Sequence, residues 1–274
     1  MNFFFNLQGI QFKILKHIKL WKCGSIVELP ELRAPNLETL DLSFCQKLLM
    51  VHESVGFLEK LRKWNLVFCD SLQTLPNNLR LISLEEFSLF GCPMLEKFPN
   101  IHQEMKRLKK LDLFGSGIRE LPSSIGYLTR LTGLRLSGCH NPRVIPNGIY
   151  KLQMLEFLSN SFDGLSEDGF LSLWKQNLSR CGIKSEILMK PSYFPILKVL
   201  NQSGNDIVRI PESLNRFTPI ETLDLRNCKQ LRQNLRLPRF INYVDARKYL
   251  SLDALSLTKL LNQVSLFQVI KNKK

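Results

Sequence analysis

The stretch LKKLDLFGSGIRELPSSIGYLTRLTGLRLSGC, residues 108–139, contains one complete unit of a repeat and the beginning of the next. Its first leucines, Leu108, Leu111 and Leu113, are separated by three and then two residues. The same triplet returns one unit later as Leu131, Leu134 and Leu136. Alternate leucines at this spacing predict a short strand that faces a core shared with neighbouring units.

The middle leucine of each triplet is an anchor from which the other units can be aligned. The predicted anchors are Ile18, Leu40, Trp64, Phe87, Leu111, Leu134, Leu155, Gln176, Leu200, Leu223 and Val244. The ten intervals from Ile18 to Val244 cover 226 residues, about 22.6 residues each, which is typical of a leucine-rich repeat. The sequence therefore predicts an α/β leucine-rich-repeat solenoid, a horseshoe with a parallel concave β-sheet, an irregular or 3₁₀ convex side and about eleven repeats.

A second column of small residues lies five positions after each anchor. Its members are Cys23, Cys45, Cys69, Cys92, Ser116, Cys139, Asn160, Cys181, Asn205 and Cys228, with Tyr249 in the last repeat. All seven cysteines of the chain are in this column. Cys, Asn and Ser are small and can hydrogen-bond loop backbone, so we expect a buried structural column of reduced thiols.

Composition narrows the setting of the chain. With 274 residues, 44% of them hydrophobic, and no apolar run of about twenty residues, we expect a long core and no membrane insertion. The opening MNFFFNLQG lacks a basic segment, so we expect no secretory signal and place the chain in the cytoplasm or nucleus. The net charge of +14 is spread over every repeat, which favours an acidic protein partner over nucleic acid.

The repeats are not equally regular along the chain. We interpret residues 1–14 as the remnant of an upstream repeat, 15–252 as the leucine-rich-repeat domain and 253–274 as a C-terminal capping helix with a basic tail. A worn repeat is expected at about 162–194, with Gln176 in the anchor position. Asp253 would cap the final helix. Its apolar face would consist of Leu257, Leu260, Leu261, Val264 and Phe267.

The segments between strands carry their own pattern. Apolar-proline pairs such as Leu121-Pro122 turn the chain away from the strand, because proline fixes its φ and disfavours helix in the preceding residue. Apolar residues then recur every third position, as in Ile125, Leu128 and Leu131. This spacing predicts 3₁₀ turns on the convex side.

The sequence contains no recognisable catalytic or metal-binding motif. There is no nucleophile elbow, HExxH, CxxC or phosphate-binding loop, and the histidines are scattered. Asp41, Asp112, Asp224 and Asp245 each follow an anchor by one residue, where we expect solvated residues or contacts to a basic partner. We therefore expect a binding module without enzymatic activity, metal or cofactor.

The residue three after each anchor is expected to point outward onto the concave sheet. This row comprises Trp21, Ser43, Val67, Phe90, Phe114, Ser137, Leu158, Ser179, Ser203, Arg226 and Arg247. Exposed aromatic residues on consecutive strands indicate a protein contact. The predicted partner-binding residues are Val67, Phe90, Phe114 and Trp21, with a charged rim of Lys63, Glu86, Lys110 and Arg135.

Three longer phrases carry a family resemblance. They are LDLSFCQKLLMVHESVGFLEKLRKWNLVFCDSLQTLP, LFGCPMLEKFPN and ELPSSIGYLTRLTGLRLSGC, within a likeness that covers about residues 7–252. The sequence here resembles the leucine-rich-repeat region of plant Toll-type nucleotide-binding resistance proteins. The resemblance implies a module that senses a pathogen effector or a guarded host protein and holds an adjoining nucleotide-binding domain inactive. ADP or ATP would belong to that domain, whose GxxxxGK[ST] loop this chain lacks.

Two other classes use such repeats. A ubiquitin ligase adaptor would recruit substrates through them, but no F-box precedes the solenoid. An extracellular receptor ectodomain would need a signal peptide and paired cap cysteines, which are also lacking here.

Overall fold

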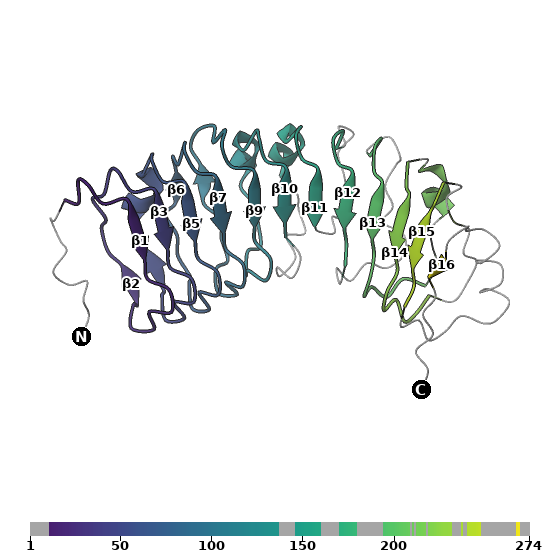
Figure 1. The fold of residues 1–274 in the computed structure, drawn as a ribbon, viewed down its shortest axis with the longest axis horizontal. Coiled ribbons are helices and arrows are strands. Elements are labelled where there is room, and N and C mark those ends of the chain that lie inside the picture. The colour runs from purple at the N-terminus through teal and green to yellow at the C-terminus, as the bar shows by residue number, and fades with distance from the viewer. Residues whose placement is uncertain are drawn as a thin grey trace. The chain divides into compact units, whose positions relative to one another are not determined.

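The protein folds as a parallel β-solenoid with little helix, seen here in a computed structural model (Figure 1). The structure describes residues 11–136, 146–159, 170–179, 194–208, 210, 212–217, 219–231, 237, 240–247 and 267–268. The chain forms two compact units, Met1–Leu155 and Glu156–Lys274.

The first unit is built on a parallel sheet with one three-residue strand per coil. Its strands are β1 (His17–Lys19), β3 (Thr39–Asp41), β5 (Lys63–Asn65), β7 (Glu86–Ser88), β9 (Lys110–Asp112) and β10 (Gly133–Arg135). The anchors lie opposite one another, with Leu40 paired to Trp64 and Phe87 to Leu111. The parallel sheet and its predicted register in this unit are confirmed.

The core is formed because alternate residues of each strand turn inward. In β3 the anchor Leu40 and the following Leu42 are fully buried. Larger anchors occupy the next two coils, where Trp64 and Phe87 stack with ring centroids 4.8 Å apart. Aromatic anchors fit this interior because they lie over each other on successive coils.

The convex side has short helices and small ladders. The 3₁₀ helices are η1 (Glu53–Phe57), η2 (Ser123–Tyr127) and η3 (Asn147–Lys151). Two-stranded ladders join β2 (Glu28–Leu29) to β4 (Met50–Val51), and β6 (Asn78–Leu79) to β8 (Asn100–Ile101). Pro122 precedes η2 at φ −69°, as expected for a turn off the strand side. The 3₁₀ prediction is therefore confirmed.

The second unit repeats this plan. Its strands are β11 (Phe157–Ser159), β12 (Lys175–Asn177), β13 (Val199–Asn201), β14 (Thr222–Asp224), β15 (Tyr243–Asp245) and β16 (Phe267–Gln268), with η5 at Glu212–Arg216. Gln176 lies in the centre of β12 and is buried, in its predicted anchor position.

One predicted anchor is wrong. Leu158, not Leu155, pairs with Gln176, and Leu158 is fully buried although the outward row contained it. Leu155 lies in the turn before the strand, where its N–H donates to the carbonyl of Leu152. Asn160, predicted in the structural column five residues after Leu155, lies outside the described residues.

Both ends of the chain lie largely outside the described residues. Gln11 forms a parallel bridge with Arg33, and residues 1–10 lie outside the described part. Phe267, expected on the apolar face of a capping helix, instead lies in β16, which pairs with β15. The rest of 253–274 and most of the worn repeat at 162–194 are outside the described residues.

Candidate functional site

The column five residues after each anchor lies inside the solenoid. Cys45, Cys69, Cys92 and Cys228 are fully buried free thiols, whereas Cys23 is half-buried. Their thiols donate to a carbonyl of the preceding coil, as from Cys69 to Leu42 at 3.2 Å and from Cys92 to Leu66 at 3.1 Å. The buried residues of the column therefore tie successive coils together.

Asparagine and serine occupy the same position in other coils. The Asn205 amide donates to the carbonyls of Leu178 and Gln202 at 2.7 and 2.8 Å, so it makes two short bonds, whereas Cys69 and Cys92 make one each. Ser116 is fully buried as well. Cys139 and Cys181 lie outside the described residues.

Burial also determines the acidity of these thiols. It raises the pKa of Cys45, Cys69 and Cys228 above the ordinary value, and that of Cys92 to about 12. Because the thiolate is the reactive form, these cysteines are not suited to nucleophilic or redox chemistry at neutral pH.

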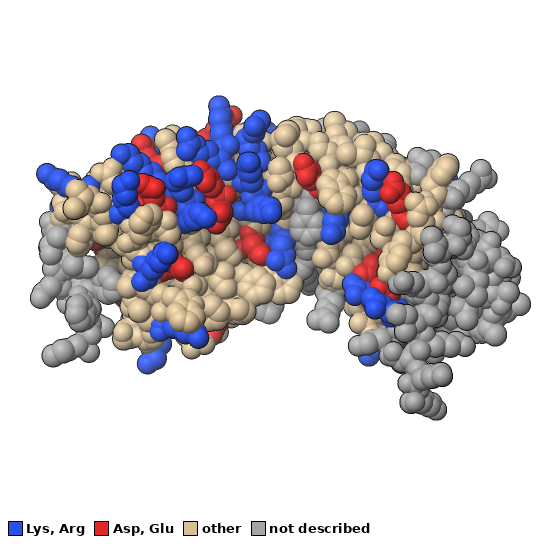
Figure 2. All heavy atoms as spheres, viewed as in Figure 1, with Lys and Arg blue, Asp and Glu red and all other residues tan. Residues whose placement is uncertain are grey.

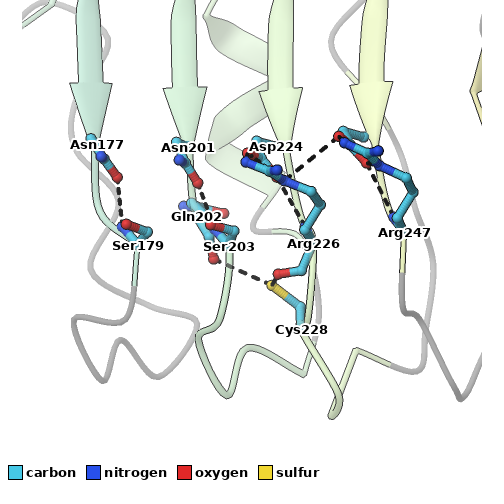
Figure 3. Close-up of polar contacts among 10 residues, drawn as sticks. Asn177, Ser179, Asn201, Gln202, Ser203, Asp224, Arg226, Cys228 and Arg247 are labelled. Carbon is cyan, nitrogen blue, oxygen red and sulfur yellow. Dashed lines mark hydrogen bonds and ion pairs between the residues drawn. The ribbon is translucent and has the colours of Figure 1, made fainter.

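A polar residue follows the anchor in most coils and holds the turn after the strand. Its side chain accepts a hydrogen bond from the backbone N–H two residues later, as Asn177 does from Ser179 at 3.0 Å and Asn201 from Ser203 at 2.8 Å (Figure 3). The same bond recurs from Asp41, Asn65, Ser88, Asp112, Asp224 and Asp245. These side chains therefore form Asx-type turns.

The aspartates of this row, which we expected to be solvated or to contact a basic partner, are half-buried at positions 41, 112 and 224 and buried at position 245. Asp245 is only 4% exposed; the Arg247 guanidinium donates to its carboxylate at 2.7 Å, and the Arg226 guanidinium lies 3.6 Å from it. Arg226 also binds Asp224 at 2.6 Å. Each arginine is thus neutralised by the carboxylates that hold its own coil.

The chain then passes through a left-handed turn directly before the small-residue column. The residues with positive φ are Lys22, Phe44, Phe68, Gly91, Gly115, Gly204 and Asn227. Glycine and asparagine adopt this conformation readily, whereas a bulky side chain is strained in it. Lys22, Phe44 and Phe68, at φ 57°, 61° and 53°, are the exceptions in this series, and two of them are aromatic.

These two phenylalanines belong to a continuous row of rings, which we call the aromatic ladder: Trp21, Phe44, Phe68, Phe90 and Phe114. Successive ring centroids are 6.3, 5.2, 5.1 and 5.2 Å apart. Trp21 is 57% exposed, Phe68 is 38% exposed and the others are half-buried. Contiguous, partly exposed rings on five coils make an apolar surface of the kind that marks interaction sites.

The ladder changes its position in the repeat without a break. Phe44 and Phe68 occupy the left-handed position, whereas Phe90 and Phe114 precede it and glycine takes that position. Gly91 has to lack a side chain, since a Cβ there would lie 2.6 Å from Cδ1 of Phe68. The ring of Phe68 therefore covers the backbone of the next coil.

Cations cover the faces of the rings at both ends. The Lys22 ammonium lies 4.3 Å from the centroid of Trp21, and the Arg135 guanidinium lies 5.2 Å from that of Phe114. Such cation–π contacts are favourable. The two outermost rings of the ladder are thus each contacted by a cation from within the protein.

The predicted site residues do not all come together. The aromatic ladder contains Trp21, Phe90 and Phe114, and Arg135 contacts it. Val67 is half-buried, and the exposed aromatic residue of its coil is Phe68. The other rim residues, Lys63, Glu86 and Lys110, begin their strands. The rings of the same coils come four or five residues after these strand-opening residues, which is roughly 13 Å or more of extended chain.

Sequence reasoning missed Phe44 and Phe68. Alternation was carried past the end of each strand, although the strands are only three residues long and the left-handed turn re-aims the next side chain. The signal was present in the dipeptides Phe44-Cys45 and Phe68-Cys69, an aromatic residue directly before the small-residue column.

The described residues contain no group of three His, Cys, Asp or Glu side chains able to hold a metal ion. Within the same part of the chain, no helix has the length and apolar character needed to span a membrane. A leucine-rich-repeat solenoid of this kind is typical of non-catalytic recognition domains.

Comparison with known proteins agrees with this picture. A family model described as disease resistance protein RPS4B-like, leucine-rich repeats, matches residues 80–256. Disease resistance protein RML1A of Arabidopsis thaliana is 32% identical over 221 residues, which are 79% of this chain and 22% of that protein. TMV resistance protein N of Nicotiana glutinosa is 30% identical over 269 residues, covering 76% of this chain and 23% of that protein.

The chain thus spans less than a quarter of the length of these two relatives. Among solved structures, an internalin of Listeria monocytogenes is similar at 12% identity and a TM-score of 0.47, with 91% of this chain and 88% of that chain covered. The repeat signature, the parallel solenoid and the family match agree: this chain belongs to the leucine-rich-repeat region of RPS4B-like plant disease resistance proteins.

Proposed function

We propose that the chain is the protein-recognition and autoinhibitory region of an intracellular plant immune receptor, acting in the cytoplasm or nucleus. Its partner is a pathogen effector, a guarded host protein or an adjoining nucleotide-binding domain. The relatives are disease resistance proteins, which supports this setting. The chemistry of the described surface, which is apolar and charged without a catalytic group, is that of a binding module.

The aromatic ladder is the observation that carries the proposal. Five rings lie in a row in the first unit with successive centroids 5.1 to 6.3 Å apart, and each of them is partly exposed. Aromatic side chains on a rigid scaffold give large contact area at low entropic cost and are enriched among residues that dominate binding energy. The ladder is therefore the apolar centre of the partner contact in this proposal.

The test combines a site variant with a matched control. Phe90→Ala/Phe114→Ala removes two stacked ladder rings, whereas Phe57→Ala/Tyr127→Ala removes two rings from the convex 3₁₀ helices that are 49% and 46% exposed. The chain would replace the matching repeats of a relative in a full-length receptor. Leaf cell death would then be scored with and without the effector of that receptor.

We expect the ladder variant to cause cell death without effector or to lose the effector response, while the convex variant behaves as wild type. The unfolding temperature should fall only slightly, because the variant removes two half-buried rings and leaves every core anchor in place. Wild-type behaviour of the ladder variant in both assays would refute the assignment. Equal defects in the two variants would mean that any exposed ring matters, and would refute it too.

A further inference from the structure

A second surface lies at the opposite end of the strands, where each strand begins. Cations and carboxylates alternate there from coil to coil and pair across coils. The nitrogen–oxygen distances are 3.0 Å for Lys16–Glu38, 3.0 Å for Arg62–Glu85 and 2.9 Å for Lys63–Glu86. Lys, Arg, Asp and Glu side chains crowd the upper rim of the first unit over β5, β7 and β9 (Figure 2).

This pairing of cations with carboxylates of the neighbouring coil stops after β7. Glu85 and Glu86 are bound by the preceding coil, and the next two coils bring four exposed cations: Arg107, Lys109, Lys110 and Arg130. None of the four has an ion pair within 4.0 Å among the described residues. We call these four residues the basic cluster. It contrasts with Lys106, which is paired with Glu104 at 2.9 Å.

Backbone pairing holds the cluster together. Lys110 lies opposite Gly133 in the sheet, and the N–H of Thr132 donates to the carbonyl of Lys109 at 2.8 Å. Arg107 and Arg130 each precede the anchor of their coil by four residues. The four cations therefore lie on two adjacent coils, whose strands are about 4.8 Å apart.

We propose that the basic cluster binds an acidic peptide segment of a protein partner. Four like charges held close together on a rigid edge repel one another, and carboxylates of a partner would relieve that repulsion while forming charge-assisted hydrogen bonds. The basic cluster is a separate surface from the aromatic ladder, because the cluster lies where β9 and β10 begin and the rings lie beyond the ends of the strands. The proposal does not depend on the ladder.

The extent of the cluster favours a peptide over nucleic acid. The four cations occupy two adjacent coils, and Glu86 lies opposite Lys110 on the coil before them, next to Glu85. Among the described residues, the next unpaired cation along this edge, Lys60, is two coils away from Lys110 and donates to Asn36 at 2.6 Å. A nucleic acid strand presents phosphates at regular intervals and needs a longer continuous basic track. A peptide with a few adjacent carboxylates fits a compact cluster.

The experiment measures binding of a fluorescein-labelled octaglutamate peptide to the full chain by fluorescence anisotropy, at about 0.1 M salt, where the screening length is about 10 Å. The site variant is Lys109→Gln/Lys110→Gln. The control is Lys47→Gln/Lys97→Gln, which removes the same charge from exposed positions of other segments. Arg107→Gln/Arg130→Gln tests the cluster through its other members.

We expect each cluster variant to weaken peptide binding at least about fivefold and the control to stay within about twofold of wild type. Circular dichroism melts should coincide for all variants, because the replaced side chains are exposed and unpaired. An equal loss of peptide binding in the control variant would mean that only the net charge of the chain matters, and it would overturn the proposal. Tighter binding of an eight-nucleotide deoxythymidine strand than of the peptide, or no binding of the peptide by the wild-type chain, would overturn it as well.

Discussion

Replacing Phe68 by glycine should leave the protein more stable than replacing it by alanine. Both changes remove the same ring and its contacts to Phe44 and Phe90, at 5.2 and 5.1 Å, so they differ by one methyl group. At φ 53° that methyl group is held in the left-handed region, which costs an L-residue about 1–2 kcal/mol. Glycine avoids this cost but loses about 0.5–1 kcal/mol more through chain entropy.

The expected difference is therefore about 1 kcal/mol in favour of Phe68→Gly. Phe90 provides the matched control, since it belongs to the same ladder but has no positive φ. There the usual order applies, and Phe90→Ala should be more stable than Phe90→Gly by about 0.5–1 kcal/mol. The sign of the alanine–glycine difference should thus reverse between two neighbouring rings.

Urea unfolding followed by circular dichroism would measure the four variants, with free energies compared only where the m values agree. Alanine being the more stable replacement at position 68 would refute the left-handed placement of this ring. The same order at both positions would show that the ladder does not shift between the two coils.

Three further changes test the surroundings of the ladder and the core. Gly91→Ala should lower the unfolding free energy by about 2 kcal/mol or more, because its methyl group would be strained at φ 70° and would contact the ring of Phe68. In a Phe68→Ala background part of this loss should disappear, and an additive double-mutant cycle would contradict the contact. Burial raises the pKa of Cys69, so the stabilising contribution of this thiol is present below about pH 9 and is lost as pH rises beyond it. Cys69→Ala should therefore make the fall of the unfolding free energy at alkaline pH less steep by up to about 1.4 kcal/mol per pH unit, and an unchanged slope would contradict this. Burial raises the pKa of Asp245, but hydrogen bonds from Arg247 outweigh it and hold that pKa below its ordinary value, so the carboxylate stabilises the fold above about pH 4 and the contribution is lost as pH falls further. Arg247→Gln should therefore lower the unfolding free energy at pH 7 and reduce the part of it that is lost on acidification in a urea series, and an unchanged acid dependence would contradict the pairing.

The sequence was sufficient for the parallel sheet because a strict period places one strand in every coil. Ten of the eleven predicted anchors lie in strand centres, including Gln176, which no hydrophobicity rule would place in a core. Leu155 was misplaced because Leu152, Leu155 and Leu158 are equally spaced. Apolar residues of the convex turns and of the strands share a spacing of three, so the pattern alone cannot tell where the turn ends.

The site was harder to predict than the fold. Phe90 and Phe114 were found because they follow the strand by the expected count, but Phe44 and Phe68 depend on a left-handed turn that alternation does not describe. Lys63, Glu86 and Lys110 begin their strands, whereas the rings follow the strands, so their part in the charged rim of the contact stays a prediction. Periodicity gives the coil of a residue, whereas its position along the strand decides which surface it joins.

The polar side chains that hold each turn also limit how this surface can change. Each strand offers the concave face two positions, before and after the anchor, and in eight coils the second is committed to a backbone N–H. A substitution there loses a turn as well as a contact. Only the residue before the anchor can vary without that cost, as it does from Thr39 to Lys63, Glu86 and Lys110. Adaptation to a new partner across the sheet would therefore proceed along a single column, one residue per coil.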